Sequence, residues 1–166
     1  MTRREVRFCP YCGVPTENRH IYGEIHPVCP SCDWVHLPDP KVAAIVLVEQ
    51  DSKILLVQRD RTPEKGKWSL PAGFVNAYED PQEAAIRECL EETGLEVKIV
   101  KLAAVLSGRE HRNGADILML YNATVTGGSL HAGDDAAGAG FFSRNELPPL
   151  AFTTNEKIIF EPEYWE

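Results

Sequence analysis

Apolar residues between positions 41 and 166 gather in short runs that turn residues separate. The first run, VAAIVLV at 42–48, is continuous, which is typical of a strand that is covered on both faces. The turn residues EQDSK follow it, and ILLVQR then predicts a returning strand. Strands are predicted in this way at 42–48, 54–59, 68–74 (interrupted by Pro71 and Gly73), 95–107 and 116–125.

One stretch carries the signals of a helix at both of its ends. Asp80 can cap the N-terminus, Pro81 suits the first helical position, and Glu83 completes a capping box. Gly94 is placed to end the helix in a left-handed conformation. Strands and a helix that follow one another along the same stretch of chain predict one α/β domain.

This helix should be amphipathic, because residues about 100° apart along the chain separate into two faces. The face predicted to meet the core consists of Ala85, Ile86, Cys89 and Leu90. The opposite, charged face consists of Arg87, Glu88, Glu91 and Glu92.

The last forty residues are less regular. A Gly- and Ala-rich stretch at 126–140 predicts a mobile loop, and GFFS after it predicts a last strand or turn. Residues 152–165 predict a C-terminal helix that starts at a threonine cap.

Composition and charge narrow the class of protein. The 43% apolar and 25% charged residues are typical of a globular protein, and no apolar run approaches the roughly 20 residues of a membrane helix. The net charge of −8 argues against broad binding to nucleic acid, which needs basic surface. The charged start MTRREVRF has no signal-peptide core, so we expect a cytoplasmic protein without a membrane partner.

Four of the five cysteines form two C-x2-C pairs in a segment that is too poor in aliphatic residues to build a core. Two such pairs can form a tetrahedral zinc site, and zinc would supply the missing folding energy. We therefore predict a structural zinc ribbon at 1–37, a linker that starts at LPDP, and a second domain at 38–166. The predicted zinc ligands are Cys9, Cys12, Cys29 and Cys32.

The charged face of the helix crowds three glutamates around a single arginine, Arg87. The crowding is open to two interpretations. It is an ordinary solvated face, or it is a site for a hard divalent cation such as Mg²⁺ or Mn²⁺, which prefers carboxylate oxygen.

Residues 73–95, GFVNAYEDPQEAAIRECLEETGL, resemble the Nudix box, G-x5-E-x7-R-E-U-x-E-E-x-G-U, in which U is a bulky aliphatic residue. Cys89 is the one departure, at a U position on the predicted core face. The eight matching residues are Gly73, Glu79, Arg87, Glu88, Glu91, Glu92, Gly94 and Leu95. The resemblance implies hydrolysis of nucleoside diphosphates linked to another moiety, and a Nudix α/β/α sandwich around a mixed sheet.

The resemblance also implies roles for the residues of the box. Glu88, Glu91 and Glu92 would bind Mg²⁺ or Mn²⁺ together with backbone carbonyls near Ala72 and Gly73. Arg87 would orient the acids through an ion pair with Glu91 or Glu79. The general base is left open between a box glutamate and an acid of a later loop, Asp134 or Asp135, for which turn formation is the alternative role.

A zinc ribbon before a Nudix domain resembles two groups, the NADH pyrophosphatases and smaller ADP-ribose and FAD pyrophosphatases. The NADH group carries S-Q-P-W-P-F-P-x-S after the box, and residues 96–125 contain nothing similar, whereas ELPPLAFTT at 146–154 resembles the second group. Candidate substrate-binding residues are Trp68, Phe74, Arg109, Arg112 and Phe152, with core packing or a solvated loop as the alternative for each.

The sequence therefore predicts a metal-dependent pyrophosphohydrolase for ADP-ribose, FAD or a related dinucleotide, which releases AMP or another nucleoside monophosphate. Alternatives within the family are an NADH pyrophosphatase and a house-cleaning nucleoside triphosphatase. An alternative of another class is a nucleotide-sensing regulatory module whose ribbon binds nucleic acid or protein. The expected partner is a small nucleotide, and family members often form homodimers.

Overall fold

The computed structural model describes residues 6–111 and 113–165. The chain divides into two compact units, Met1–Asp39 and Pro40–Glu166. In the described residues, no helix has the length and apolar character needed to cross a membrane.

The smaller unit is built on one antiparallel hairpin of strands β1 (Glu17–Ile21) and β2 (Glu24–Val28). Its two-residue turn, Tyr22 and Gly23, has positive φ at both positions, as a tight hairpin turn requires. Both C-x2-C pairs lie in turns that flank the hairpin. Among residues 6–39, the buried apolar side chains are Cys9, Val28 and Cys29, which form a very small core.

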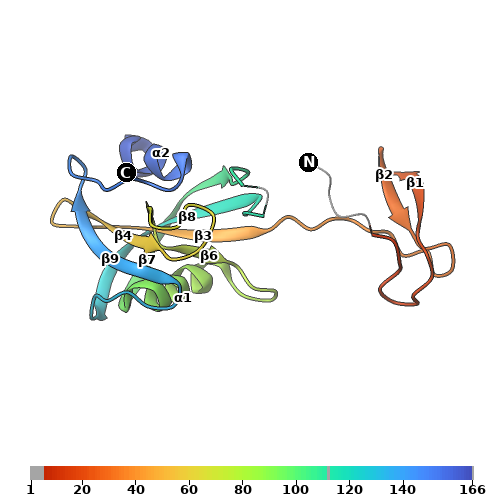
Figure 1. The fold of residues 1–166 in the computed structure, drawn as a ribbon, viewed down its shortest axis with the longest axis horizontal. Helices are drawn as coiled ribbons and strands as arrows, with labels where there is room; N and C mark the ends of the chain where they lie inside the picture. The colour runs from red at the N-terminus through yellow and green to blue at the C-terminus, as the bar shows by residue number, and fades with distance from the viewer. Residues whose placement is uncertain (1–5, 112, 166) are drawn as a thin grey trace. The chain divides into compact units, whose positions relative to one another are not determined.

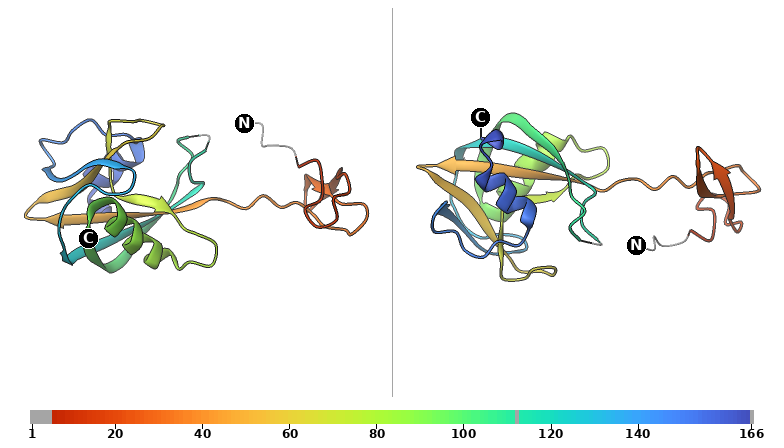
Figure 2. Two further views of the ribbon diagram at one scale, coloured as in Figure 1. Left: turned by 60° about the horizontal axis from the view of Figure 1, so that its bottom comes forward. Right: turned by 90° about the horizontal axis from the view of Figure 1, so that it is seen from above.

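The larger unit is a mixed β-sheet structure with α1 (Pro81–Thr93) on one side and α2 (Thr153–Phe160) on the other (Figures 1 and 2). This arrangement confirms the predicted α/β/α sandwich. Its strands are β3 (Val42–Gln50), β4 (Lys53–Arg59), β5 (Trp68–Ser69), β6 (Ala72–Phe74), β7 (Leu95–Ser107), β8 (Ile117–Gly128) and β9 (Ala136–Ser143), and a 3-10 turn (Pro162–Tyr164) follows α2.

Strand β3 lies at the centre of the sheet. It runs parallel to β8 and antiparallel to β6, and the hairpin to β4 carries the sheet on to β9 and β5. Alternate residues of β3 serve different cores. Ala44, Val46 and Val48 pack in the cluster that contains residues of α1, whereas Ile45 and Leu47 pack in the cluster that contains residues of α2. The continuous apolar run is therefore covered on both faces, as predicted.

The caps of α1 agree with the sequence signals, with one difference. Gly94 ends the helix with φ +69° and donates its N–H to the Leu90 carbonyl at 2.8 Å. Asp80 caps the start, but its carboxylate accepts from the N–H of Gln82 at 2.7 Å instead of that of Glu83.

The predicted faces of α1 were wrong at two positions. Leu90, which was predicted to face the core, is 45% exposed, and Glu92, which was predicted on the solvated face, is 8% exposed. At about 100° per residue, Glu92 lies 60° from Cys89, whereas Leu90 lies 100° away on the other side. The buried face is consequently centred on Ala85, Cys89 and Glu92, and the polarity of Glu92 concealed this from the sequence.

The predicted mobile loop at 126–140 was also wrong over most of its length. Strand β8 continues to Gly128, and β9 begins at Ala136 and pairs with β4. The small residues of β9 have a packing role, because a Cβ at Gly138 would lie 3.3 Å from the Trp68 ring and one at Gly140 would lie 3.1 Å from that of Phe142.

The C-terminal helix is shorter than predicted and has no threonine cap. Phe152 occupies the N-cap position, and its side chain forms no capping bond. The carboxylate of Glu110 instead accepts from the N–H groups of Thr153 at 3.0 Å and Thr154 at 2.7 Å. A residue of a loop that is distant in sequence therefore accepts the hydrogen bonds of the free N–H groups at the N-terminus of α2.

Candidate functional site

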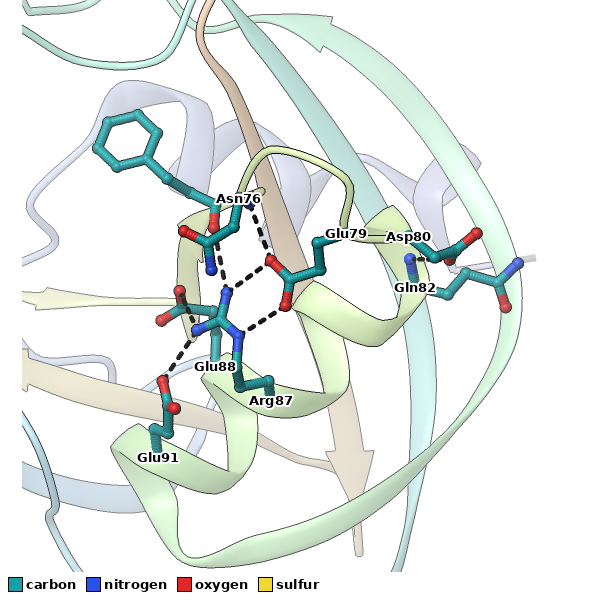
Figure 3. A network of polar contacts seen from close by, with 8 residues as sticks. Asn76, Glu79, Asp80, Gln82, Arg87, Glu88 and Glu91 are labelled. Carbon is teal, nitrogen blue, oxygen red and sulfur yellow. Dashed lines mark hydrogen bonds and ion pairs between the residues drawn. The ribbon is translucent and has the colours of Figure 1, made fainter.

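Arg87 is the hub of an ion-pair network on α1 (Figure 3). Its guanidinium makes two bonds to Glu79, at 2.7 and 3.0 Å, and single bonds to Glu88 at 2.8 Å and Glu91 at 2.9 Å. The predicted pairings with Glu79 and Glu91 are both present, and the contact with Glu88 is an addition. The same guanidinium donates to the Phe74 carbonyl at 3.2 Å, which ties the helix to the end of β6.

The carboxylates of this site differ in their electrostatic state. Hydrogen bonding to Arg87 lowers the pKa of Glu79 to about 2. Burial raises the pKa of Glu88, and it raises the pKa of Glu92 to about 8 despite the bond that Glu92 accepts from the backbone. The helix therefore presents acids that range from exposed Glu91 to buried Glu92.

The acids of α1 lie directly against the backbone of β6. Glu92 accepts a hydrogen bond from the N–H of Ala72 at 3.0 Å. A Cβ at Gly73 would lie 1.9 Å from the carboxyl carbon of Glu88, so any side chain at this position would displace that carboxylate. The sequence places the acids and this backbone 15 to 20 residues apart, and the fold brings them into contact.

This donor set fits a hard divalent cation, because carboxylate oxygens beside backbone carbonyls are the ligands such ions prefer. In the present arrangement, however, Arg87 holds Glu88 and Glu91, and the Ala72 N–H holds Glu92. Within the described residues, the four cysteines are the group whose ligand atoms all approach within 4.8 Å of one another.

Asp135 lies beside the acid cluster, together with Glu92, Arg59 and Arg61 in a small recess. Arg61 is 3.6 Å from the Asp135 carboxylate. Asp135 also contributes to the raised pKa of both Glu88 and Glu92, which places its charge near theirs. The later-loop acid named from the sequence is thus brought to the site.

The position of Asp135 is set by the loop 129–135, which docks on the C-terminus of α1. Backbone N–H groups of Ser129, His131 and Gly133 donate to the carbonyls of Gly94, Thr93 and Glu92 at 2.9 to 3.1 Å. These are carbonyls that a helix end leaves without partners. The contact is tight, because a Cβ at Gly133 would lie 2.4 Å from the Glu91 carbonyl oxygen.

A cavity of about 630 Å³ opens beside this site and is lined by Ala72, Gly73 and Phe74 of β6 on one side. Phe152 lines it as well, with the Arg59 guanidinium carbon 5.0 Å from its ring centroid. Arg59 also lines the recess with Glu92 and Asp135, so it connects the cavity to the acid cluster. No pattern in the sequence marks Arg59, because it is the last residue of an ordinary strand.

The remaining predicted substrate residues lie in different surroundings. Phe74 lines the cavity, whereas Trp68 packs edge-to-face on Phe142 at 4.7 Å and is not part of the lining. Arg109 is largely exposed, 3.6 Å from Asp116. Arg112 lies outside the described residues.

The four predicted zinc ligands come together in the smaller unit. Their sulfur atoms are separated by 3.4 Å between Cys12 and Cys29, 3.6 Å between Cys9 and Cys32, and 3.8 Å between Cys12 and Cys32. A tetrahedral site with Zn–S distances of about 2.3 Å requires sulfur separations of about 3.8 Å. Four cysteines with this spacing can hold a metal ion, and they leave no position open for catalysis.

The NUDIX domain family matches this chain over residues 38–161. The chain is 44% identical over 128 residues to an ADP-ribose pyrophosphatase of Methanocaldococcus jannaschii, an alignment that covers 76% of this chain and 75% of the relative. It is 29% identical over 149 residues to the NAD-capped RNA hydrolase NudC of Vibrio atlanticus, covering 89% of this chain but 53% of that protein.

The structure of a NUDIX hydrolase from Nitrosomonas europaea superimposes with a TM-score of 0.84 at 30% identity, covering 95% of this chain and 90% of that one. This fold, with an acidic helix set against the β6 backbone, is shared with that NUDIX hydrolase. The chain belongs to the NUDIX domain family and is a Nudix hydrolase, a family that uses divalent metals.

We predict that Gly133→Ala lowers turnover by about tenfold to a hundredfold, because the added methyl pushes the loop off α1 and moves Asp135, and small displacements at a reacting centre are costly. Turnover numbers and thermal stability of the full-length enzyme measure the effect. Ala132→Ser, an exposed change one residue earlier, is the matched control. Unchanged turnover in Gly133→Ala would show that the docking of this loop does not matter to catalysis.

The buried Glu92 predicts a pH dependence of stability in buffer without added divalent metal. Its folded pKa of about 8 is above the ordinary value of about 4.3, so the folded state retains a proton that the unfolded state releases. The free energy of unfolding should therefore fall as pH rises from about 4.3 to 8. Glu92→Gln keeps an acceptor for the Ala72 N–H and removes the charge.

Urea denaturation at pH 5, 6.5 and 8 should show that Glu92→Gln is more stable than the wild type at pH 8, with a smaller difference at pH 5. The same substitution at the exposed Glu91 is the control. A wild type and Glu92→Gln with parallel stability profiles over this range would contradict the prediction.

Proposed function

We propose that this enzyme hydrolyses the pyrophosphate bond of ADP-ribose, FAD or a related dinucleotide and releases AMP. The observation that carries the proposal is the junction at Arg59, where the acid cluster meets a cavity large enough for a nucleotide moiety. A substrate lying across this junction has its diphosphate at the acids and one of its two substituents in the cavity.

Glu88, Glu91 and Glu92 are the proposed ligands of catalytic Mg²⁺ or Mn²⁺, with the backbone carbonyl of Gly73. When bound, the metal neutralises diphosphate charge and lowers the pKa of the attacking water. Arg87 is a positioning residue, since it holds Glu88 and Glu91 in place and is itself fixed by Glu79. A cation held by Glu88 and Glu91 would compete with Arg87 for their oxygens.

Asp135 is the proposed general base, with Glu92 or another box glutamate as the alternative. Its support is the recess that it shares with Glu92. Arg59 is proposed to contact a phosphate, because its Nε donates to the Pro63 carbonyl at 3.0 Å while its guanidinium lies over the Phe152 ring. These two contacts fix the side chain and leave its terminal nitrogens available for a bidentate phosphate contact.

ADP-ribose is favoured as substrate by the Methanocaldococcus relative, which shares three quarters of its length with this chain. NADH or an NAD-capped RNA is the second candidate, supported by the NudC relatives, although this chain spans about half of their length. A regulatory module is disfavoured because every acid of the box is present, and a nucleoside triphosphatase has no specific support in the structure.

For the smaller unit, we propose a structural zinc ion bound by Cys9, Cys12, Cys29 and Cys32. The small core of this unit supports the assignment, since three buried apolar residues bury too little surface to fold a segment of this length. Homodimer formation stays a prediction from the family resemblance.

A product-resolved hydrolysis screen with Mg²⁺ and with Mn²⁺ tests the proposed reaction. It should include ADP-ribose, FAD, NADH, dinucleoside polyphosphates and nucleoside triphosphates. We expect ADP-ribose or FAD to give the highest kcat/KM, with AMP among the products. Exclusive hydrolysis of nucleoside triphosphates would contradict the substrate assignment.

In the same assay, Glu91→Gln and Glu92→Gln should each lower kcat by about a hundredfold or more, because a lost metal contact removes several kcal/mol of transition-state stabilisation. Glu83→Gln, an exposed change in the first turn of the same helix, is the matched control. Normal rates in the two variants would show that these carboxylates are not the metal ligands.

Cys12→Ser in the full-length chain should remove the zinc ion and unfold the smaller unit, because the segment has no other source of folding energy. Zinc content by mass spectrometry and limited proteolysis of the N-terminal segment measure the outcome. Ser31→Ala, within the second cysteine turn, is the control. An ordered N-terminal unit in zinc-free protein would overturn the proposal.

A further inference from the structure

Two side chains that line the cavity have a polar group without a hydrogen bond among the described residues, and in His111 that group is also buried. The Nε2 atom of His111 is buried and has no hydrogen bond among the described residues. Asn155 is 4% exposed, and its Oδ1 accepts from the N–H of Leu70 at 3.1 Å. That bond fixes the orientation of the carboxamide, and no hydrogen bond from its Nδ2 occurs in the part of the chain that the structure describes.

An unpaired buried polar group such as Nε2 of His111 destabilises a folded protein, so its position in the lining of a cavity points to a ligand that would pair with it. His111 and Asn155 both line the cavity and come from different segments, a loop before β8 and the first turn of α2. The fold thus brings two independent polar groups to one cavity.

The rest of the lining provides flat apolar surface. The Phe152 ring contacts the His111 ring edge-to-face at 5.0 Å, and Phe74 lies on the opposite strand, β6. A planar heteroaromatic ring needs apolar contact on its faces and polar groups at its edge. The lining provides Phe74 and Phe152 for the first and His111 and Asn155 for the second.

We propose that this cavity is a subsite for a heteroaromatic base of the substrate, and that His111 and Asn155 are specificity-determining residues that hydrogen-bond to the edge of the base. The proposal rests on the proposed function, because Arg59 at the end of the cavity leads to the acid cluster where the diphosphate would lie. The Nδ2 group of Asn155 donates to a ring nitrogen, and His111 pairs with an exocyclic group.

Binding of AMP and of ribose 5-phosphate to the full-length protein, measured by calorimetry without added divalent metal, tests the proposal. His111→Phe keeps a ring against Phe152 and removes both ring nitrogens. Asn155→Asp keeps the acceptor for the Leu70 N–H and removes the Nδ2 donor. Each variant should weaken AMP binding about tenfold, as expected for one lost hydrogen bond, and leave ribose 5-phosphate binding unchanged.

Asn145→Asp, the same exchange at an exposed residue outside the cavity lining, is the matched control. A measurement without any variant uses the wild type with inosine monophosphate, in which an oxo group replaces the exocyclic amine of AMP. We expect a clear difference in affinity between the two nucleotides. This comparison remains informative if Asn155→Asp does not fold.

Equal binding of AMP and inosine monophosphate, or unchanged AMP binding in His111→Phe, would overturn the base subsite. A loss of ribose 5-phosphate binding in the variants would overturn it as well and would identify a sugar subsite. Because these experiments involve no turnover, they stay decisive even if the hydrolysis screen shows that the proposed substrate is wrong.

Discussion

The contact between α1 and the backbone of β6 is the constraint on which the site depends. Glu92 accepts from the Ala72 N–H, Glu88 fills the space that the missing side chain of Gly73 leaves, and Arg87 reaches the Phe74 carbonyl. Three successive backbone positions thereby meet three acidic or basic groups of one helix. This contact brings the carboxylates to one edge of the cavity and fixes them at different depths.

Those different depths give similar side chains different chemical characters. Glu91 is exposed, Glu88 is partly buried, and Glu92 is nearly enclosed, with a pKa raised to about 8 by burial. Burial of the charged form of such an acid lowers the stability of the fold, and under the proposed metal assignment a bound cation would offset that cost. The apolar half of the helix therefore does more than fill the core, because it sets how far each acid is buried.

Much of the fold and of the acid cluster could be predicted from the sequence, because their signals are local. The caps of α1, the hairpin between β3 and β4, and the spacing of the box acids each depend on residues a few positions apart. The burial of Glu92 was mispredicted, since periodicity alone does not reveal that a charged residue belongs to the buried face. The first half of strand β9 was mispredicted as loop, because its small residues pack against the rings of Trp68 and Phe142.

Phe74 and Phe152 of the cavity were candidates from the sequence, but its polar residues were not. Arg59 ends a strand, His111 lies in an irregular loop and Asn155 lies in a helix, and each lines the cavity through contacts with residues about 40 to 100 positions away. The role of a residue can be predicted from a sequence pattern when it depends on neighbouring positions. It cannot be predicted in this way when it depends on contacts between separate elements of the fold.

The glycine that ends α1 shows how such distant contacts enter a local motif. Gly94 needs its positive φ, yet a Cβ there would also lie 2.1 Å from the ring of His131 in the loop that positions Asp135. Of the two glycines that bound the box, Gly73 thus leaves space for Glu88 of the helix, and Gly94 leaves space for His131 outside it. The glycine positions of the box therefore depend on tertiary packing, because the space left by their missing side chains is occupied by the residues that lie against them.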